Sequence, residues 1–336
     1  MRGVVGWDIG GVNTKVARAE AGALRGSRSV PLQIQHDFDR LPFVLRQLAR
    51  DIGAQPDDRH ALTFTAELSQ RFRTKSEGVH AILDAVESAL PDADIRVLAT
   101  DARWLTPRDA RDEPLAVSAS NWMATALLVS QQHADALLID IGSTTTDIVP
   151  IVGGQVKARG RTDLERLADS ELVYTGAVRT PVEALLRALP VRSDLVMPAA
   201  EGFALTGDVH VWLGSLAPES YSIPTPDGRP ATREFAGERL LRTVCADRTM
   251  LSDAAVTVIA HATADAQVQL VLAAIRHARE RWPELQYAVV AGLGDFIAER
   301  AAKLAGLEVV RLRDTWADAS IVAPAAAAAL LLDQVD

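Results

Sequence analysis

Short apolar runs alternate along the chain with longer stretches whose apolar residues recur every three or four positions. The short runs are typical of buried strands, and the longer stretches are typical of amphipathic helices. The expected strands are residues 4–9, 15–20, 61–65, 95–99, 136–141, 146–152, 287–291 and 308–312. The expected helices are residues 41–51, 79–90, 121–131, 181–189, 253–282 in at least two pieces, 295–304 and 325–332. This alternation predicts an α/β protein with mixed sheets.

The length of the chain predicts two lobes. It has 336 residues, of which 48% are apolar, and domains commonly hold about 100–200 residues. We expect a first lobe at residues 1–119 plus 322–336 and a second lobe at residues 120–321. Residues 216–236 contain the sequence TPDGRP and are rich in Pro, Gly and Ser, which predicts a loop.

Charge and cysteine content exclude several classes of function. The formal net charge is −9 and the sequence pI is about 5.3, which argues against nucleic acid as the main partner. Cys245 is the single cysteine, so an internal disulfide and a cysteine metal cluster are excluded. Cys245 lies on an apolar helical pattern, and we expect it to be buried.

The chain lacks the pattern of a secretory signal, and its longest apolar run, residues 322–332, is too short to cross a bilayer. We therefore expect a cytoplasmic protein without a membrane partner. The sequence leaves its oligomeric state open, self-association included.

One polar bend occurs twice. The stretch DIGGVNTK, Asp8 to Lys15, matches DIGSTTTD, Asp140 to Asp147, with Asp, Ile, Gly and Thr at equivalent places. Each stretch lies between two apolar runs. An internal repeat of this kind predicts two related lobes that each begin with a hairpin.

The residues of the two bends suit a phosphate group. Glycine lets the backbone turn sharply and approach a ligand, and successive N–H groups then attract an anion. A carboxylate at the end of a strand can hold Mg²⁺, usually through water. Two such bends that face each other across a cleft would bind a polyphosphate–metal unit from both sides, whereas a plain hairpin turn is the alternative for each. The expected phosphate-binding residues are Lys15, Gly10, Gly11, Asn13, Thr14, Gly142, Ser143, Thr144 and Thr145, and the expected metal ligands are Asp8, Asp140 and Asp147.

These two bends resemble the phosphate hairpins of the superfamily of sugar kinases, heat-shock chaperone ATPases and actin. A third stretch, VVAGLGDFIAER, has Gly292 and Gly294 between an expected strand and helix and resembles the nucleotide-binding turn of that superfamily. The resemblance implies a two-lobed actin-like ATPase fold, which is ribonuclease H-like, with a cleft between the lobes that closes over its ligand. ATP is the cofactor that this fold implies.

Further stretches point to one branch of that superfamily. They read AELSQRFRTKSEGV, SASNWMATA, IDIGSTTTDIVPI, YTGAVRTPV, EGFALTGDVHVWLG and CADR. Together they resemble the hydantoinase/oxoprolinase-like family found beside tetrahydromethanopterin-linked C1-transfer genes, a branch that builds the methanofuran core. The resemblance implies an ether-forming transferase in which a tyramine- or tyrosine-type phenol displaces diphosphate from an aminomethyl-furanmethanol diphosphate. It implies Mg²⁺ and no requirement for ATP.

Several polar residues could serve that chemistry. Asp8, Lys15 and Asp140 would act on the leaving diphosphate. Glu67 is a candidate base for the phenol or an anchor for the substrate amine. The basic residues Arg71, Arg73 and Lys75 could neutralise the diphosphate or bind a γ-glutamyl carboxylate, or they could lie on a solvated loop.

Two further positions are weighed in the same way. Asp208 and His210 alternate in the sequence TGDVHVW and would share one face of a strand. There they could act as a base or metal ligands, or be polar residues at the edge of a sheet. Asn121 could line the substrate cleft, and Asp247 with Arg248 could form an ordinary ion pair.

Other functions stay open at this point. One is an ATP-dependent small-molecule kinase, for which Asp101 would be the catalytic aspartate. Another is a lactam hydrolase like oxoprolinase. A third is a nucleotide-responsive scaffold, which is disfavoured because the chain shows neither a long substrate-binding domain nor a filament insertion.

Overall fold

The apolar runs of the first third of the chain pair into one six-stranded sheet. The computed structural model describes residues 2–335, and the strands of this sheet follow the order β3-β2-β1-β4-β5-β6. Their bounds are β1 Val4–Ile9, β2 Asn13–Glu20, β3 Ala23–Pro31, β4 Arg59–Phe64, β5 Ile95–Leu98 and β6 Trp104–Leu105. Strand β1 pairs antiparallel with β2 and parallel with β4. The sheet is therefore mixed, as the sequence predicts.

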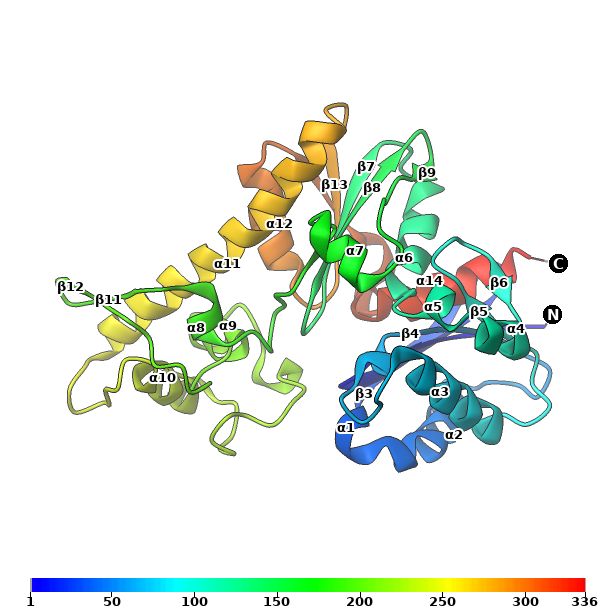
Figure 1. Cartoon of the computed structure of the whole chain (residues 1–336), viewed down its shortest axis with the longest axis horizontal. Helices are drawn as coiled ribbons and strands as arrows, with labels where there is room; N and C mark the ends of the chain where they lie inside the picture. Colours follow the sequence, from blue (N-terminus) through cyan, green and yellow to red (C-terminus); the bar gives the residue numbers. More distant parts are fainter. Residues whose placement is uncertain (1, 336) are drawn as a thin grey trace. The chain divides into compact units, whose positions relative to one another are not determined.

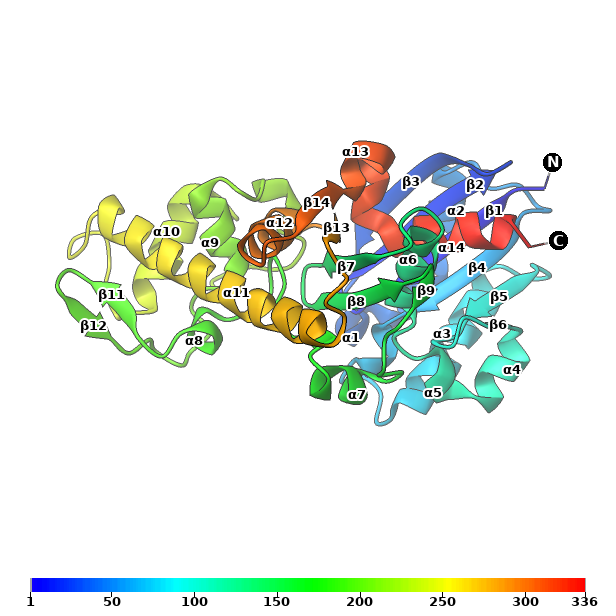
Figure 2. The same ribbon diagram turned by 90° about the horizontal axis from the view of Figure 1, so that it is seen from above.

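Alternation along β1 places two different layers on the two faces of this sheet, which Figure 1 shows edge-on and Figure 2 shows after a turn of 90°. Val5, Trp7 and Ile9 join a large apolar core. That core includes residues of α2 (Leu41–Asp51) and α3 (Lys75–Ala89). Gly6 lies on the other face, where a Cβ atom would come within 2.0 Å of the Ala325 carbonyl oxygen. The helix α14 (Ala323–Asp333) therefore packs directly on the backbone of β1.

A second mixed sheet has the order β10-β8-β7-β13-β14, with β9 paired to β8. Figure 1 shows its strands and the helices that follow them. The strands are β7 Ala136–Ile141, β8 Thr146–Val152, β9 Gln155–Val156, β10 Leu172–Val173, β13 Tyr287–Ala291 and β14 Glu308–Arg311. The small hairpin of β11 (Leu189–Val191) and β12 (Asp194–Val196) forms a sheet of its own.

The helices fill the intervals between strands. Besides α2, α3 and α14 they are α1 Ile34–Asp37, α4 Pro107–Asp112, α5 Pro114–Val117, α6 Asn121–Ser130, α7 Asp163–Ala168, α8 Val182–Leu185, α9 Thr206–Leu213, α10 Arg233–Arg242, α11 Asp253–Arg281, α12 Asp295–Leu304 and α13 Leu312–Trp316. Short 3₁₀ turns are η1 Phe38–Arg40, η2 Ala66–Leu68, η3 Pro218–Ser220 and η4 Ala317–Val322.

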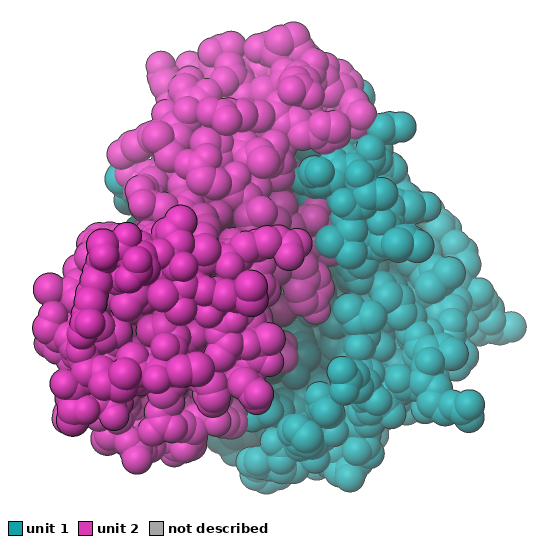
Figure 3. All heavy atoms as spheres, turned by 60° about the vertical axis from the view of Figure 1, so that its left-hand side comes forward, with its two compact units in different colours: residues 1–138, 149–171, 311–336 teal, residues 139–148, 172–310 magenta. Residues whose placement is uncertain are grey.

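The chain forms two compact units, which Figure 3 colours separately. Unit 1 comprises Met1–Leu138, Val149–Glu171 and Arg311–Asp336, and unit 2 comprises Ile139–Ile148 and Leu172–Val310. Each unit is described by itself below. The lobe boundaries expected from the sequence, at residues 119/120 and 321/322, stay a prediction.

Most elements lie where the apolar pattern predicts them. The strands at residues 136–141, 146–152 and 287–291 and the helix at residues 295–304 have the predicted bounds. Strand β3 was not predicted from the sequence because Ala23–Pro31 carries no apolar run and is only partly buried. Edge strands need only one paired side, so they give a weak pattern.

Three predictions were wrong. The stretch at residues 253–282 is one helix of 29 residues instead of several pieces, since it contains no Pro or Gly that would break it. The predicted helix at residues 181–189 is shortened to α8, because Leu189 already pairs in β11. Cys245 is exposed instead of buried. It follows the end of α10 and has a left-handed φ of 54°.

Two helical stretches are long and apolar enough to cross a membrane by composition alone. They are Asp253–Arg281 and Leu312–Asp333, and 56% and 67% of their most apolar windows are buried inside the fold. Burial of this kind is typical of core helices in a globular protein.

Gly6→Ala should destabilise unit 1 by about 2–3 kcal/mol or more, because the new methyl group would overlap the backbone of α14. Gly26→Ala is the matched control in the same sheet, since nothing lies within 4 Å of its Cβ position. We expect the control to change the free energy of unfolding by less than about 1 kcal/mol. Urea unfolding of both variants tests this, and equal stabilities would contradict the tight packing of α14 on β1.

Candidate functional site

The first bend joins β1 to β2 in unit 1. The Gly10 N–H donates to the Asn13 carbonyl at 2.9 Å and closes a tight turn. Asp8 lies opposite Lys15 in the β1–β2 register, and Lys15 Nζ contacts Asp8 Oδ2 at 3.2 Å. Asp8 is 2% exposed, and its Oδ1 atom makes no hydrogen bond to the described residues. One buried carboxylate oxygen at the bend is therefore available for a ligand.

The neighbours of the first bend differ in how they could contribute. Space is open at the Cβ position of Gly11, where nothing lies within 4 Å. The Thr14 side chain is fully buried. It alternates with Lys15 and so lies on the opposite face of the sheet from Asp8. The structure does not favour the expected contact between the Thr14 hydroxyl and phosphate.

The second bend joins β7 to β8 in unit 2 and repeats the first. The Gly142 N–H donates to the Thr145 carbonyl at 2.9 Å. This bond joins residues three positions apart, as does the bond from Gly10 to Asn13 that closes the first bend. Asp140 is 8% exposed at the end of β7, and Asp147 is 8% exposed and pairs with Leu172 of β10. The sequence repeat therefore corresponds to a repeat of local backbone structure.

The Gly292–Gly294 turn packs against this second bend. Gly292 has a φ of +83°, and a Cβ atom there would lie 2.4 Å from Asp140 Oδ1. The Gly294 N–H donates to the Ile141 carbonyl at 2.8 Å. Glycine is required at position 292 both by its backbone angle and by this close approach. Unit 2 therefore brings together two of the three glycine-rich stretches that the sequence singles out.

Glu67 is the most deeply buried carboxyl group among the candidates in unit 1. It lies in η2, directly after β4, and is 1% exposed. Neither carboxylate oxygen makes a hydrogen bond of normal geometry, and Lys75 Nζ lies 3.9 Å from Oε1. Burial raises the pKa of Glu67 to about 8, against the opposing effect of the Lys75 ammonium. The group can therefore exchange a proton near neutral pH.

Lys75 is shared between two acids. Its Nζ atom contacts Asp163 Oδ2 at 2.5 Å in addition to Glu67. Asp163 begins α7, and the Thr162–Glu165 capping box fixes the start of that helix. Asp163 was not predicted as a site residue, because nothing in the sequence indicates a pairing across 88 positions. Lys75 is thus committed to neighbouring carboxylates.

The predicted basic cluster is divided by the structure. Lys75 contacts buried acids, whereas Arg71 Nη2 pairs with Asp39 Oδ1 at 2.9 Å on the surface. Arg73 is exposed, and its backbone N–H donates to Glu77. Asn121 begins α6 and is half-buried. These residues do not form one basic patch, which favours the solvated alternative for Arg71 and Arg73.

Asp208 and His210 lie on helix α9, so the prediction that they share a strand face was wrong. The alternation of TGDVHVW also fits a helix that is buried on all sides, and burial of seven residues of α9 removes any periodicity. The Asp208 carboxylate accepts a bond from Arg239 Nε at 2.8 Å and one from the Leu205 N–H at 2.9 Å. Its catalytic role stays a prediction that these contacts do not favour.

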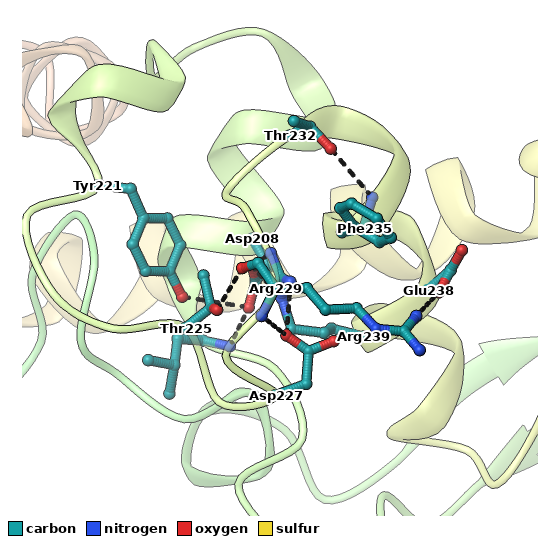
Figure 4. Close-up of polar contacts among 10 residues, drawn as sticks. Asp208, Tyr221, Thr225, Asp227, Arg229, Thr232, Phe235, Glu238 and Arg239 are labelled. Carbon is teal, nitrogen blue, oxygen red and sulfur yellow. Dashed lines mark hydrogen bonds and ion pairs between the residues drawn. The ribbon is translucent and has the colours of Figure 1, made fainter.

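Figure 4 shows what Asp208 holds in place. Arg239 is fully buried and contacts Asp227 as well as Asp208. Tyr221 Oη donates to Asp208 at 3.4 Å. Tyr221 and Asp227 belong to the loop predicted at residues 216–236, so this network fixes that loop to the helices α9 and α10.

His210 takes part in a second buried chain of contacts. Its Nε2 lies 2.8 Å from Gln267 Oε1, and Gln267 Nε2 donates to Thr175 Oγ1 and to the Gly176 carbonyl. Burial lowers the pKa of His210 to about 4, so the ring is neutral at physiological pH. Gln267 lies within α11, and nothing in the sequence of that helix singles it out as a functional residue.

Asp247 and Arg248 do not pair with each other: Asp247 accepts bonds from Thr249, and Arg248 contacts Asp253.

Within residues 2–335 no group of three or more His, Cys, Asp or Glu side chains is arranged to hold a metal ion. A bound Mg²⁺ would therefore need ligand oxygens from a substrate or water.

Glu67→Gln tests the raised pKa of this carboxyl group. Folded Glu67 keeps its proton up to about pH 8, whereas the unfolded side chain loses it near its ordinary pKa of 4.5. Stability therefore falls as pH rises between these values and levels off above them. Gln mimics the protonated acid, so its stability relative to the wild type should rise by on the order of 2 kcal/mol from pH 6 to pH 9.

Urea unfolding at both pH values measures this difference. Glu284→Gln is the control, because Glu284 is an exposed glutamate. A Glu67→Gln curve that runs parallel to the wild type across the range would show that Glu67 is ionised in the folded state at pH 6.

A family model and two curated relatives match this chain. The model of the hydantoinase/oxoprolinase family matches residues 58–335. The (4-{4-[2-(gamma-L-glutamylamino)ethyl]phenoxymethyl}furan-2-yl)methanamine synthase of Methanocaldococcus jannaschii is 34% identical over 333 residues, which cover 98% of each chain. The synthase of the same name from Methanococcus vannielii is 32% identical over 213 residues, or 62% of this chain and 95% of that protein.

Solved structures with about 12% identity share the fold. A nucleotide-free acetone carboxylase chain aligns with a TM-score of 0.60 over 97% of this chain and 70% of its own. A ROK family glucokinase from Streptomyces griseus aligns with a TM-score of 0.50 over 98% of each chain. These likenesses confirm the actin-like ATPase fold predicted from the two hairpins. With a family match over most of its length, this chain belongs to the hydantoinase/oxoprolinase family.

Proposed function

We propose that this chain is a transferase that forms an aryl–alkyl ether in the biosynthesis of a methanofuran-type cofactor. In the proposed reaction, a tyramine- or tyrosine-type phenol displaces diphosphate from an aminomethyl-furanmethanol diphosphate. The observation that carries the proposal is 34% identity over 98% of both chains to a synthase whose name describes the ether product. The proposal places the reaction in the cytoplasm, without a requirement for ATP.

Each bend, taken by itself, would bind a phosphate group. Each combines a tight glycine turn with an almost buried aspartate, a chemistry suited to phosphate and a hydrated cation. Asp8 supports a role toward Mg²⁺, because its Oδ1 atom is buried without a hydrogen bond while Lys15 contacts the other oxygen. When bound, Mg²⁺ would neutralise charge on the leaving diphosphate. Lys15 would add a positive charge at the same bend.

The ionised form of Glu67, which predominates above about pH 8, would accept the proton of the phenol. Its pKa of about 8 lies between that of an ordinary carboxyl group and that of a phenol near 10. The phenol oxygen bonds to the furanyl methylene carbon while the bond from that carbon to the diphosphate oxygen breaks. The electron pair leaves with the diphosphate, and the proton passes to the carboxylate. An ion pair between Glu67 and the aminomethyl group of the substrate is the alternative role of this residue.

A direct assay tests the proposed reaction. The purified protein is incubated with the furan diphosphate, Mg²⁺ and one of tyramine, tyrosine or their γ-glutamyl forms, and the ether is detected by mass spectrometry. We expect ether and inorganic pyrophosphate in equal amounts, no effect of ATP, and loss of activity with EDTA. Absence of ether with every phenol, together with hydrolysis of ATP, would replace this proposal with an ATP-dependent kinase or lactam hydrolase.

Asp8→Asn and Asp140→Asn should each lower the rate of ether formation by about 100-fold or more, since each removes a charge from a bend. Asp112→Asn in unit 1 and Asp194→Asn in unit 2 are the controls, because both residues are exposed. Steady-state rates and unfolding curves of all four variants separate a catalytic loss from misfolding. A normal rate in either bend variant would remove that residue from the mechanism.

A further inference from the structure

Arg179 lies beside the second bend and was not among the residues predicted from the sequence. Its Nη1 atom donates to Thr144 Oγ1 at 3.5 Å, and the side chain is exposed. It takes part in no ion pair with a carboxylate among the described residues. Two other arginines of unit 2 do pair with acids: Arg239 contacts Asp208 and Asp227, and Arg229 contacts Glu238. Arg179 is therefore a cation beside the glycine turn whose charge no side chain neutralises.

The backbone around Arg179 wraps the second bend. The Ala177 N–H donates to the Gly142 carbonyl at 2.9 Å, and the Val178 and Arg179 N–H groups donate to the Ser143 carbonyl at 3.0 and 2.9 Å. A Cβ atom on Gly176 would lie 2.5 Å from the Thr144 backbone nitrogen. Residues 174–180 therefore lie so close to the bend that position 176 has no room for a side chain.

Buried polar contacts fix this segment from behind. Gln267 Nε2 and Thr206 Oγ1 both donate to the Gly176 carbonyl, at 2.8 and 2.9 Å. The Gly176 N–H donates to Thr180 Oγ1 at 3.1 Å, and the two hydroxyls of Thr175 and Thr180 lie 3.0 Å apart. The backbone that carries Arg179 is therefore fixed by contacts on both sides. Because this backbone is already ordered, less conformational entropy is lost when the guanidinium binds a ligand.

We infer that Arg179 binds the diphosphate group of the substrate at the second bend. This inference rests on the proposed function and adds a residue to it. A guanidinium presents several N–H donors in a plane and matches two phosphate oxygens at once. Its fixed positive charge attracts the negatively charged diphosphate when the substrate binds. Thr144 holds the guanidinium next to the bend before the ligand arrives.

Binding of inorganic pyrophosphate with Mg²⁺, measured by calorimetry, tests Arg179 without turnover. We expect Arg179→Ala to weaken pyrophosphate binding by about 10- to 100-fold and Arg179→Lys to weaken it less, because lysine keeps the charge and loses the paired donors. Arg187→Ala is the matched control, since Arg187 is an exposed residue of the same unit. Equal affinities for Arg179→Ala and the wild type, or no binding by the wild type, would overturn the inference.

Kinetics separates this inference from the proposed function. In the ether assay, Arg179→Ala should raise KM for the furan diphosphate and leave KM for the phenol unchanged. A wild type that forms ether together with an Arg179→Ala variant of normal KM would refute the role of Arg179 alone. A wild type that binds pyrophosphate through Arg179 but forms no ether would refute the reaction and keep the anion site. Stronger binding of ATP than of pyrophosphate, lost in Arg179→Ala, would identify a nucleotide as the source of the diphosphate group.

Discussion

Close contact between backbones, closer than a Cβ atom permits, is the constraint on which both units depend. In unit 1, Gly6 lets α14 lie directly on β1, next to the strand end that carries Asp8. In unit 2, Gly176 and Gly292 bring two separate segments against the second bend. At each place a methyl group would force backbone atoms apart, and backbone cannot move out of the way as a flexible side chain can. The glycines therefore define where the polar residues of the bends lie.

Buried charge serves two different purposes in this protein. Asp208 and Arg239 are both fully buried and contact each other, so each supplies the partner that the other needs in a medium of low polarity. They connect α9 and α10 to the loop between them. Glu67 is equally buried, but its oxygens make no hydrogen bond of normal geometry to the described residues, and its ammonium neighbour is shared with Asp163. A buried carboxyl group whose oxygens are not fully hydrogen-bonded is typical of a binding or catalytic site.

The sequence predicts the strands and the two bends well, because apolar runs and glycine turns are local signals. The N–H groups of Gly10 and Gly142 make equivalent hydrogen bonds that close the two bends, so here a short sequence repeat corresponds to a repeat of backbone structure. The sequence does not predict which polar residues meet across long separations. The pairing of Lys75 with Asp163, and of Gln267 with Thr175 and Gly176, depends on tertiary packing and leaves no local pattern. Asp208 was misplaced for a related reason, since a helix buried on all sides loses its periodicity.

The unbroken length of α11 has a mechanical consequence. A helix of 29 residues extends about 43 Å, and Gln267, near its middle, supports the segment that wraps the second bend. The same helix packs against both α9 and α12. Because α11 contains neither Pro nor Gly, it forms one continuous support without a built-in kink, and through Gln267 it holds the segment that lies against the Ser143 loop.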